Sequence, residues 1–268
     1  MPILRPGDES PWVADLQRAL RQRGLYDRKI DGGFGSGTEG AVRAFQHSAG
    51  LAVTGLADEP TMRALGLEQL IGPVPDAAPE SAVLLFSGAS FQNVQTNLPF
   101  VVAGLVDSGL ADKAMFLMAL ATIRAETAGF VPMDELRSRF NTSPGGHPFD
   151  LYDEKRDLGN LGRPDGERYK GRGFIQLTGR ANYAAIGRLI GLGDQLVNDP
   201  DLANEPSIAG RILAEFLKRA ERTIRVALEA KDFALARKAV NGGSHGLDQF
   251  RAAYQRGLEI YSDTLRLR

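Results

Sequence analysis

YKGRGFIQLTGRANY, residues Tyr169–Tyr183, is the most densely patterned stretch of the chain, with three glycines, two arginines and an Asn-Tyr pair. Apolar and polar residues alternate over Phe174–Thr178, which predicts an extended segment with Gln176 and Thr178 on one face. Glycines precede that segment and allow a tight turn or a close approach of the backbone. Two interpretations follow: a buried hairpin with glycine turns, or the wall of a groove that presents amide and hydroxyl groups to a polar polymer.

The composition indicates a globular protein without thiol chemistry. The chain has 268 residues, of which 43% are apolar and 24% charged, and its formal net charge is -1. This length allows one large domain or two smaller ones with a sizeable core. The balanced charge does not point to nucleic acid or an anionic membrane as the main partner. Because there is no cysteine, disulfides, iron–sulfur sites and catalytic thiols are excluded.

Metal chemistry and membrane insertion are not expected either. The three histidines, His47, His147 and His245, are widely separated and show no HExxH-like pairing, so we expect neither a metal nor another cofactor. The longest uncharged apolar run, Ala114–Ile123, is about half of a membrane span. The N-terminal MPILRPGDES has neither the basic start nor the apolar run of a signal peptide, so we expect synthesis in a host cytoplasm without one.

Residues 1–70 predict a small module of three helices. Ser10 is placed to cap a helix that opens with proline, and Gly24 ends that helix. A second helix is expected from about Thr38, and a short third one over Thr61–Leu65. Three helices of this size make a marginal core, so the glycine turns between them should matter to its stability.

These glycine turns follow a faint internal repeat. Asp31-Gly32 and Thr38 align with Thr54-Gly55 and Thr61 at a spacing of 23 residues. Together with VADLQRALRQRGLY, DGGFGSGTEGAVRAFQ and GLAVTGLADEPTMRAL, this pattern resembles the peptidoglycan-binding domain type 1 family. The resemblance covers nearly the whole module and implies non-catalytic attachment to bacterial cell wall.

A proline-rich segment separates the module from the rest of the chain. Gly72–Pro79 has three prolines in eight residues and no apolar periodicity, which predicts a semi-rigid linker. We place the module at 1–70, the linker at 71–82 and a second, mostly helical domain at 83–268, so the expected fold class is all-α. Residues 130–168 are rich in proline and glycine, and so long an irregular region within a compact domain is usually functional or mobile.

Glu126 is the first candidate for acid chemistry. It lies near the end of an apolar helix expected over Asp112–Ala128. The helix macrodipole disfavours a negative charge at this end, and apolar neighbours do the same. Both effects favour the protonated carboxyl that a general acid needs near neutral pH. The alternative is a solvated carboxylate at a helix end.

Hydrolysis of a glycosidic bond also needs a second carboxylate, placed to activate water or to attack directly. Five acids of the loop-rich segment are available: Asp134, Glu135, Asp150, Asp153 and Glu154. Glu135 lies nine residues beyond Glu126, so a chain reversal can bring the two opposite each other. Any of these acids is otherwise a surface residue.

Four motifs occur in order between about residue 125 and residue 250: IRAETAGF, DLYDEKRDLGN, DGERYKGRGFIQLTGRANY and NGGSHGLDQF. They resemble glycoside hydrolase family 19, and most closely its bacterial and bacteriophage branch that lyses cell walls. The resemblance implies a helical, lysozyme-like domain of two lobes with a substrate groove between them. It further implies that Glu126 is the general acid, and it favours Glu135 as the second carboxylate.

The same resemblance implies a set of groove contacts. They fall on side chains that can hydrogen-bond sugar hydroxyls and N-acetyl groups, namely Gln176, Thr178, Asn182, Tyr183 and Asn241. Tyr183 is also placed to stack on a sugar ring, whereas the alternative for Asn182 and Tyr183 is helix capping and core packing. Arg251 corresponds to a family arginine that orients the general acid.

Two positions depart from plant-type chitinases. Those enzymes carry a glutamate after the Asn-Gly-Gly turn, where this chain has His245. Their second acid lies 22 residues beyond the first, where this chain has Pro148. Because of these departures, the plant-type pattern does not identify the second carboxylate of this chain, and it does not support chitin as the substrate.

The leading hypothesis is an endolysin-type glycoside hydrolase that cleaves β-1,4 bonds in the glycan strands of peptidoglycan. Glu126 would protonate the glycosidic oxygen, and Glu135 would activate water or stabilise the oxocarbenium ion. An inverting reaction would place the two carboxyl groups roughly 6.5–9.5 Å apart. The enzyme is expected to be a monomer that acts on the wall in the periplasm after release, without nucleic acid or membrane insertion. The alternatives are a chitinase and an inactive wall-binding protein.

Overall fold

The computed structural model describes residues 3–68, 76–86, 88–127, 129–241 and 246–268. Every regular element in these parts is a helix, and strand pairing appears there only as isolated bridges. The expected all-α fold class is therefore confirmed. No helix within the described ranges combines the length and the apolar character that crossing a membrane requires.

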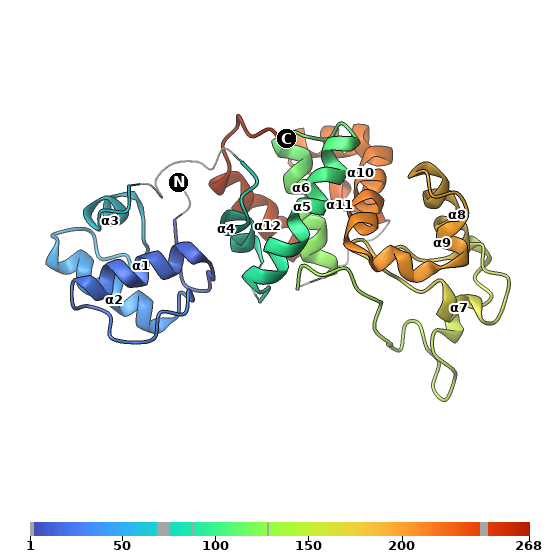
Figure 1. Cartoon of the computed structure of the whole chain (residues 1–268), viewed down its shortest axis with the longest axis horizontal. Coiled ribbons are helices and arrows are strands. Elements are labelled where there is room, and N and C mark those ends of the chain that lie inside the picture. Colours follow the sequence, from blue (N-terminus) through green and yellow to red (C-terminus); the bar gives the residue numbers. More distant parts are fainter. Residues whose placement is uncertain (1–2, 69–75, 87, 128, 242–245) are drawn as a thin grey trace.

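The first three helices form a small module at one end of the molecule (Figure 1). They are α1 (Pro11–Gln22), α2 (Ser36–Ser48) and α3 (Glu59–Ala64). As predicted, the hydroxyl of Ser10 caps α1 by accepting from the N–H of Val13. The second and third helices begin slightly earlier than the sequence pattern indicated.

Two buried glutamines explain the repeat within the module. The amide oxygen of Gln17 accepts from the N–H of Gly32 in the first glycine turn, and its nitrogen donates to a threonine hydroxyl in the following helix. Gln46 binds the second turn in the same way, through the N–H of Gly55 and the next threonine. Neither glutamine side chain has exposed surface. Each turn thus has its backbone polar groups satisfied by one internal amide.

The remaining helices form a larger lobe in the centre of Figure 1 and a smaller one at the end far from the module. The larger lobe holds α4 (Pro79–Ala82), η2 (Val83–Leu85), α5 (Phe91–Asp107), α6 (Lys113–Glu126), α10 (Pro206–Glu229), α11 (Phe233–Asn241) and α12 (Leu247–Ile260). The smaller lobe holds η3 (Asp150–Tyr152), η4 (Arg156–Leu158), α7 (Asp165–Arg168), α8 (Arg180–Leu189), α9 (Gln195–Asn198) and η5 (Pro200–Asn204). The 3-10 helix η5 leads directly into α10, so it joins the two lobes.

Helix α6 is the central helix of the larger lobe. Every residue from Met115 to Ile123 is buried, which is typical of a helix that other helices enclose. Helices α5, α10 and α12 pack against it. The carboxylate of Asp112 caps α6 by accepting from the N–H of Met115, and the helix ends at Glu126. The predicted apolar helix is therefore confirmed, and its enclosed position fixes where Glu126 lies.

The backbones of α5 and α10 approach each other closely at two glycines. A Cβ at Gly104 would lie 2.6 Å from the carbonyl oxygen of Gly210, and a Cβ at Gly210 would overlap the carbonyl oxygen of Phe100. Because both obstacles are backbone atoms, a side chain at either position must push the helices apart. The two glycines therefore allow α10 to pack along α5.

Gly210→Ala should destabilise the protein by about 1–3 kcal/mol, because the added methyl group separates α5 from α10. Thermal unfolding followed by circular dichroism measures the change. Gly40→Ala in α2 is the control, since a Cβ there meets nothing within 4 Å. Helix propensity favours alanine at that position by about 1 kcal/mol. A Gly210→Ala protein as stable as the wild type would contradict the close approach.

Part of the expected linker belongs to the packed domain. Residues 69–75 lie outside the described residues. Pro79–Ala82, which we assigned to the linker, form α4, in which Ser81 and Ala82 have no exposed surface. The Ser81 hydroxyl also donates to the hydroxyl of Tyr261 at 2.9 Å. The packing of the second domain thus begins at α4, because these residues complete its core.

The start of the module contacts α12 of the larger lobe. The guanidinium of Arg256 lies 3.0 Å from the Asp8 carboxylate and donates to the carbonyl of Ile3 at 2.7 Å. Both charged side chains are nearly buried, with 8% of Asp8 and 5% of Arg256 exposed. At the surface, Glu259 lies 3.0 Å from Arg256 and 3.8 Å from Arg5. This buried pair holds the module against α12.

Arg256→Met should destabilise the protein by about 3 kcal/mol near pH 7, because the Asp8 carboxylate stays buried without its counter-charge. Burial raises the pKa of Asp8, an effect that Arg256 partly offsets. The stability lost in Arg256→Met should therefore decrease as the pH falls through that raised pKa, since protonated Asp8 needs no counter-charge. Urea denaturation at about pH 7 and about pH 4 measures both effects.

Arg5→Met is the matched control for this contact. The Arg5 guanidinium pairs with the half-exposed Glu259 and acts on the Asp8 carboxylate more weakly than Arg256 does, so removing its side chain should cost less than about 1 kcal/mol of stability. The Arg5 N–H that donates to Asp8 is kept in this variant. Two results would contradict a buried pair at the interface. One is an equal decrease in the free energy of unfolding for Arg5→Met and Arg256→Met, and the other is a decrease for Arg256→Met that does not depend on pH.

Candidate active site

An arginine from a neighbouring helix holds Glu126. The carboxylate closes α6, is 13% exposed, and accepts from the guanidinium of Arg237 in α11 at 2.6 Å. The Arg237 side chain has no exposed surface. Its positive charge offsets the unfavourable interaction between a carboxylate and a helix C-terminus. The sequence pattern predicted apolar neighbours for this carboxyl group, with bulk water as the alternative. The structure shows a third environment, in which a buried arginine contacts the carboxyl group.

The arginine that contacts Glu126 is not the one expected. Arg251 is exposed on α12, and the ion pair that Glu126 forms among the described residues is with Arg237. Arg237 was absent from the predicted site, although its spacing carried a signal. It falls with Phe233 and Val240 on the apolar face of α11, and an arginine on a buried face requires an acidic partner.

Glu135 is fixed by hydrogen bonds in the loop that follows α6. Its N–H donates to the carbonyl of Gly171 at 2.7 Å, and Oε2 accepts from the N–H of Gly171 at 3.1 Å. Oε1 accepts from the Tyr152 hydroxyl and the Asn141 amide, both at 2.9 Å. Burial, and then the charge of Glu135, raise the pKa of Tyr152 above its usual range, so its hydroxyl remains a donor. The carboxylate is thus oriented while staying partly exposed.

Three of the other acids considered as second carboxylates either bind elsewhere in the loop or are exposed. Asp153 is buried and lies 2.9 Å from the ring of His147. Asp150 accepts from the N–H of Ser143 at 2.7 Å and so closes a loop. Glu154 is exposed. This leaves Asp134 and Glu135 as the acids beside the central stretch.

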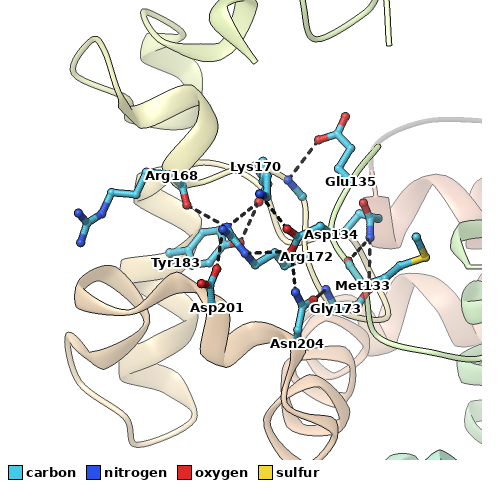
Figure 2. Close-up of polar contacts among 12 residues, drawn as sticks. Met133, Asp134, Glu135, Arg168, Lys170, Arg172, Gly173, Tyr183, Asp201 and Asn204 are labelled. Atoms are coloured by element: carbon cyan, nitrogen blue, oxygen red, sulfur yellow. Dashed lines mark hydrogen bonds and ion pairs between the residues drawn. The ribbon is translucent and has the colours of Figure 1, made fainter. Parts of the chain in front are cut away.

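Asp134 belongs to a cluster of charges behind Glu135. Its carboxylate lies 2.8 Å from Lys170 Nζ, 3.3 Å from Arg172 Nε and 2.6 Å from the Asn204 amide. Burial by itself would raise the pKa of Asp134, but these bonds and charges outweigh it and lower the pKa. Figure 2 shows Asp134 turned into this cluster and Glu135 turned away from it. The cluster therefore fixes the loop, and the Glu135 carboxylate lies outside it.

The central stretch is a tight turn rather than the extended segment expected. Arg172 and Leu177 form an antiparallel bridge, and Gly173–Gln176 make the turn between them. Gln176 has a φ of 55°, in the left-handed region, which an extended strand excludes. The alternation of burial nevertheless holds, since Leu177 is buried while Gln176 and Thr178 are partly exposed. The hairpin interpretation is thus the correct one for the backbone.

Gln176 lies beside Glu135. Its amide donates to the carbonyl of Met133 at 3.0 Å. A Cβ at Gly171 would lie 2.8 Å from Gln176 Oε1 and 3.1 Å from Glu135 Oε2, so the two side chains meet over this glycine. The Thr178 hydroxyl donates to the carbonyl of Gln176 at 2.9 Å. The fold therefore brings Glu135, Gln176 and Thr178 of the predicted set together.

Tyr183 does not reach a groove. Its side chain has no exposed surface, and its hydroxyl donates to the carbonyl of Lys170 at 2.8 Å and accepts from Arg172 at 3.1 Å. The prediction that Tyr183 stacks on a sugar is wrong, because its ring is part of the core. Asn182, by contrast, is partly exposed in the first turn of α8, where its amide donates to the carbonyl of Thr178 at 2.7 Å.

Asn241 is the last residue of α11. Its side chain lies outside the described residues, as do residues 242–245, so the predicted contact from Asn241 and the role of His245 stay predictions. Elsewhere in the described chain, no group of three or more His, Asp or Glu side chains could hold a metal ion.

Two acids from different parts of the fold are thus each oriented by donors. Glu126 closes the central helix of the larger lobe, and Glu135 lies in the loop that leads to the smaller lobe, beside amide and hydroxyl groups. Acid-catalysed hydrolysis of a glycosidic bond uses two such carboxyl groups together with donors for sugar hydroxyls. The described chain is therefore a helical fold that holds two oriented carboxyl groups of the kind that such hydrolysis uses.

Comparisons with known proteins support this class. Residues 9–65 match the family model described as a putative peptidoglycan binding domain, and residues 153–218 match that of class I chitinases. The two matches fall in different parts of the chain, the first within the three-helix module and the second across the smaller lobe and the first half of α10. The second match includes the central stretch, whereas both candidate acids precede it.

Individual relatives match only part of the chain. It is 48% identical over 56 residues to the acidic endochitinase pcht28 of Solanum chilense, which is 20% of this chain and 22% of that protein. It is 41% identical over 63 residues to a spore cortex-lytic enzyme of Bacillus cereus, 24% of either protein. This chain therefore spans less than a quarter of the length of these curated relatives. Among solved structures, chitinase C from Streptomyces griseus HUT6037 is similar with a TM-score of 0.49 and 18% identity, over 68% of this chain and 75% of that one.

Gly171→Ala should lower glycosidase activity by about tenfold to a hundredfold, because the new methyl group displaces Glu135 or Gln176. Hydrolysis of purified peptidoglycan, followed as new reducing ends, measures the loss. Gly129→Ala is the control in the same loop, since a Cβ there meets nothing within 4 Å. Full activity in Gly171→Ala would show that this close contact does not position the acid.

Proposed function

We propose that this protein is an endolysin-type glycoside hydrolase that cleaves β-1,4 bonds in the glycan strands of peptidoglycan. The observation that carries the proposal is the presence, in one chain, of a putative peptidoglycan binding domain and a class I chitinase segment. The relative named as a spore cortex-lytic enzyme supports a lytic role. The arrangement of Glu126 and Glu135 supports acid-catalysed hydrolysis.

In this proposal Glu126 protonates the glycosidic oxygen as the bond to the leaving sugar breaks. Proton donation leaves a carboxylate, which the buried guanidinium of Arg237 stabilises and keeps in orientation. Glu135 takes a proton from the attacking water or stabilises the oxocarbenium ion. Tyr152 and Asn141 keep the Glu135 carboxylate in place through its Oε1.

The module contributes by tethering. An attached module raises the local concentration of substrate at the active site without any new contact there. The buried pair between Asp8 and Arg256 places the module on the α12 side of the larger lobe. We propose that the protein acts as a monomer on the cell wall in the periplasm, after release from a host cytoplasm.

Glu126→Gln should abolish lysis of permeabilised Gram-negative cells while wall binding persists, because the amide cannot donate the acid proton. Removal of a general acid costs roughly a hundredfold to ten-thousandfold in rate. Glu135→Gln should have a comparable effect, whereas Glu154→Gln, an exposed acid of the same loop region, should not. Loss of turbidity measures lysis, and co-sedimentation with purified walls measures binding. A wild-type protein that binds walls without lysing cells would indicate a wall-binding protein whose catalytic domain is inactive. Unchanged lysis by Glu126→Gln would contradict the role of Glu126 as the general acid.

A chitinase is the second candidate, because the class I chitinase model and the endochitinase relative both match this chain. Release of sugars from colloidal chitin, compared with lysis of walls, separates the two functions. Mass analysis of the released muropeptides then identifies the bond, since the new reducing end lies on either MurNAc or GlcNAc.

A further inference from the structure

A pocket beside the predicted groove has the chemistry to bind a carboxylate. It measures about 470 Å³ and lies where α8, α10 and α11 meet. Its lining offers an amide, an aromatic ring, a guanidinium and a hydroxyl, from Asn182, Phe216, Arg219 and Thr223. None of these groups except Asn182 belongs to the predicted set of substrate contacts.

The pocket adjoins the supports of both candidate acids. On one wall, Asn182 donates to the carbonyl of Thr178, which follows the turn beside Glu135. On the opposite wall, Val240 lies about one turn of α11 from Arg237, the arginine that pairs with the candidate general acid. The pocket therefore lies between α8 of the smaller lobe and the helix whose arginine pairs with Glu126.

Arg219 is the cation of this part of α10 that lines the pocket. Lys218 and Arg225 both pair with Glu221, at 2.8 Å and 2.9 Å. Among the described residues, neither Arg219 nor Arg222 pairs with an acid in this way, and of these two exposed arginines only Arg219 lines the pocket. A guanidinium that lines a pocket without a carboxylate from its own chain is suited to a carboxylate from a ligand.

We propose that this pocket binds a carboxylate on the branch that distinguishes peptidoglycan from chitin, and that Arg219 selects for that branch. This rests on the proposed function. The N-acetylglucosamine units of chitin carry no carboxylate, whereas alternate sugars of peptidoglycan carry a lactyl ether that is extended by an acidic peptide. Arg219 pairs with the carboxylate, Thr223 donates a second hydrogen bond, and Phe216 contacts the apolar part of the branch.

Three soluble tetrasaccharides test this selectivity: one with stem peptides, the same strand after an amidase has left only the lactyl carboxylate, and chitotetraose. Arg219→Ala should lower kcat/KM on the first by about tenfold and leave kcat/KM on chitotetraose unchanged. Arg219→Lys should recover part of the loss because it restores the charge. A loss that persists on the stripped strand identifies the lactyl carboxylate as the ligand, and a loss that disappears identifies the peptide.

Arg222→Ala is the matched control, since Arg222 is an exposed arginine of the same helix that does not line the pocket. It should change none of the three rates. An equal fall on all three substrates in Arg219→Ala, or no fall on the strand with peptides, would overturn the proposal.

Binding measured by calorimetry with the Glu126→Gln protein provides the same comparison without turnover. Arg219→Ala in that background should weaken binding of the strand with peptides by about tenfold and leave chitotetraose binding unchanged. A wild-type protein that hydrolyses none of the three would contradict the proposed hydrolase, and the ratio of affinities would still decide whether Arg219 recognises the branch.

Discussion

A carboxylate at the C-terminal end of a buried helix needs a compensating charge, and the larger lobe is built to provide one. Helix α6 is enclosed by its neighbours, so Glu126 emerges at a fixed point with little exposed surface. Arg237 reaches it from α11 with no exposed surface at all. Since breaking a buried pair by removing one partner costs about 3–5 kcal/mol, this contact couples the position of α11 to the end of α6.

The second candidate acid depends on a different set of contacts. The loop that carries Glu135 is tied to the central stretch through Gly171 and through the charged cluster of Asp134, Lys170 and Arg172. That cluster also reaches η5 through Asn204. Glu126 belongs to the helices of the larger lobe and Glu135 to the loop and turn of the other side. The distance between the acids is therefore a property of how the lobes pack.

Much of the fold could be predicted because its signals are local. Caps at Ser10 and Asp112 mark helix starts, and an uninterrupted apolar run identifies an enclosed helix. The extended segment was predicted wrongly because burial alternates in a tight turn as it does in a strand, and only the backbone of Gln176 distinguishes them. Tyr183 was placed in a groove because its type suits sugar binding, but packing against the core decided its position.

The amino-acid sequence by itself determined the all-α class, the three-helix module, and the two glutamates as candidates, because these follow from residue types and short spacings. Only the tertiary structure decided which side chains hold those glutamates. Arg237 lies 111 residues from Glu126, and Gly171 lies 36 residues from Glu135. Such partners are brought together by the packing of helices and lobes, which short-range periodicity does not encode. The pocket with Arg219 has the same origin, since α8, α10 and α11 must pack together before it exists.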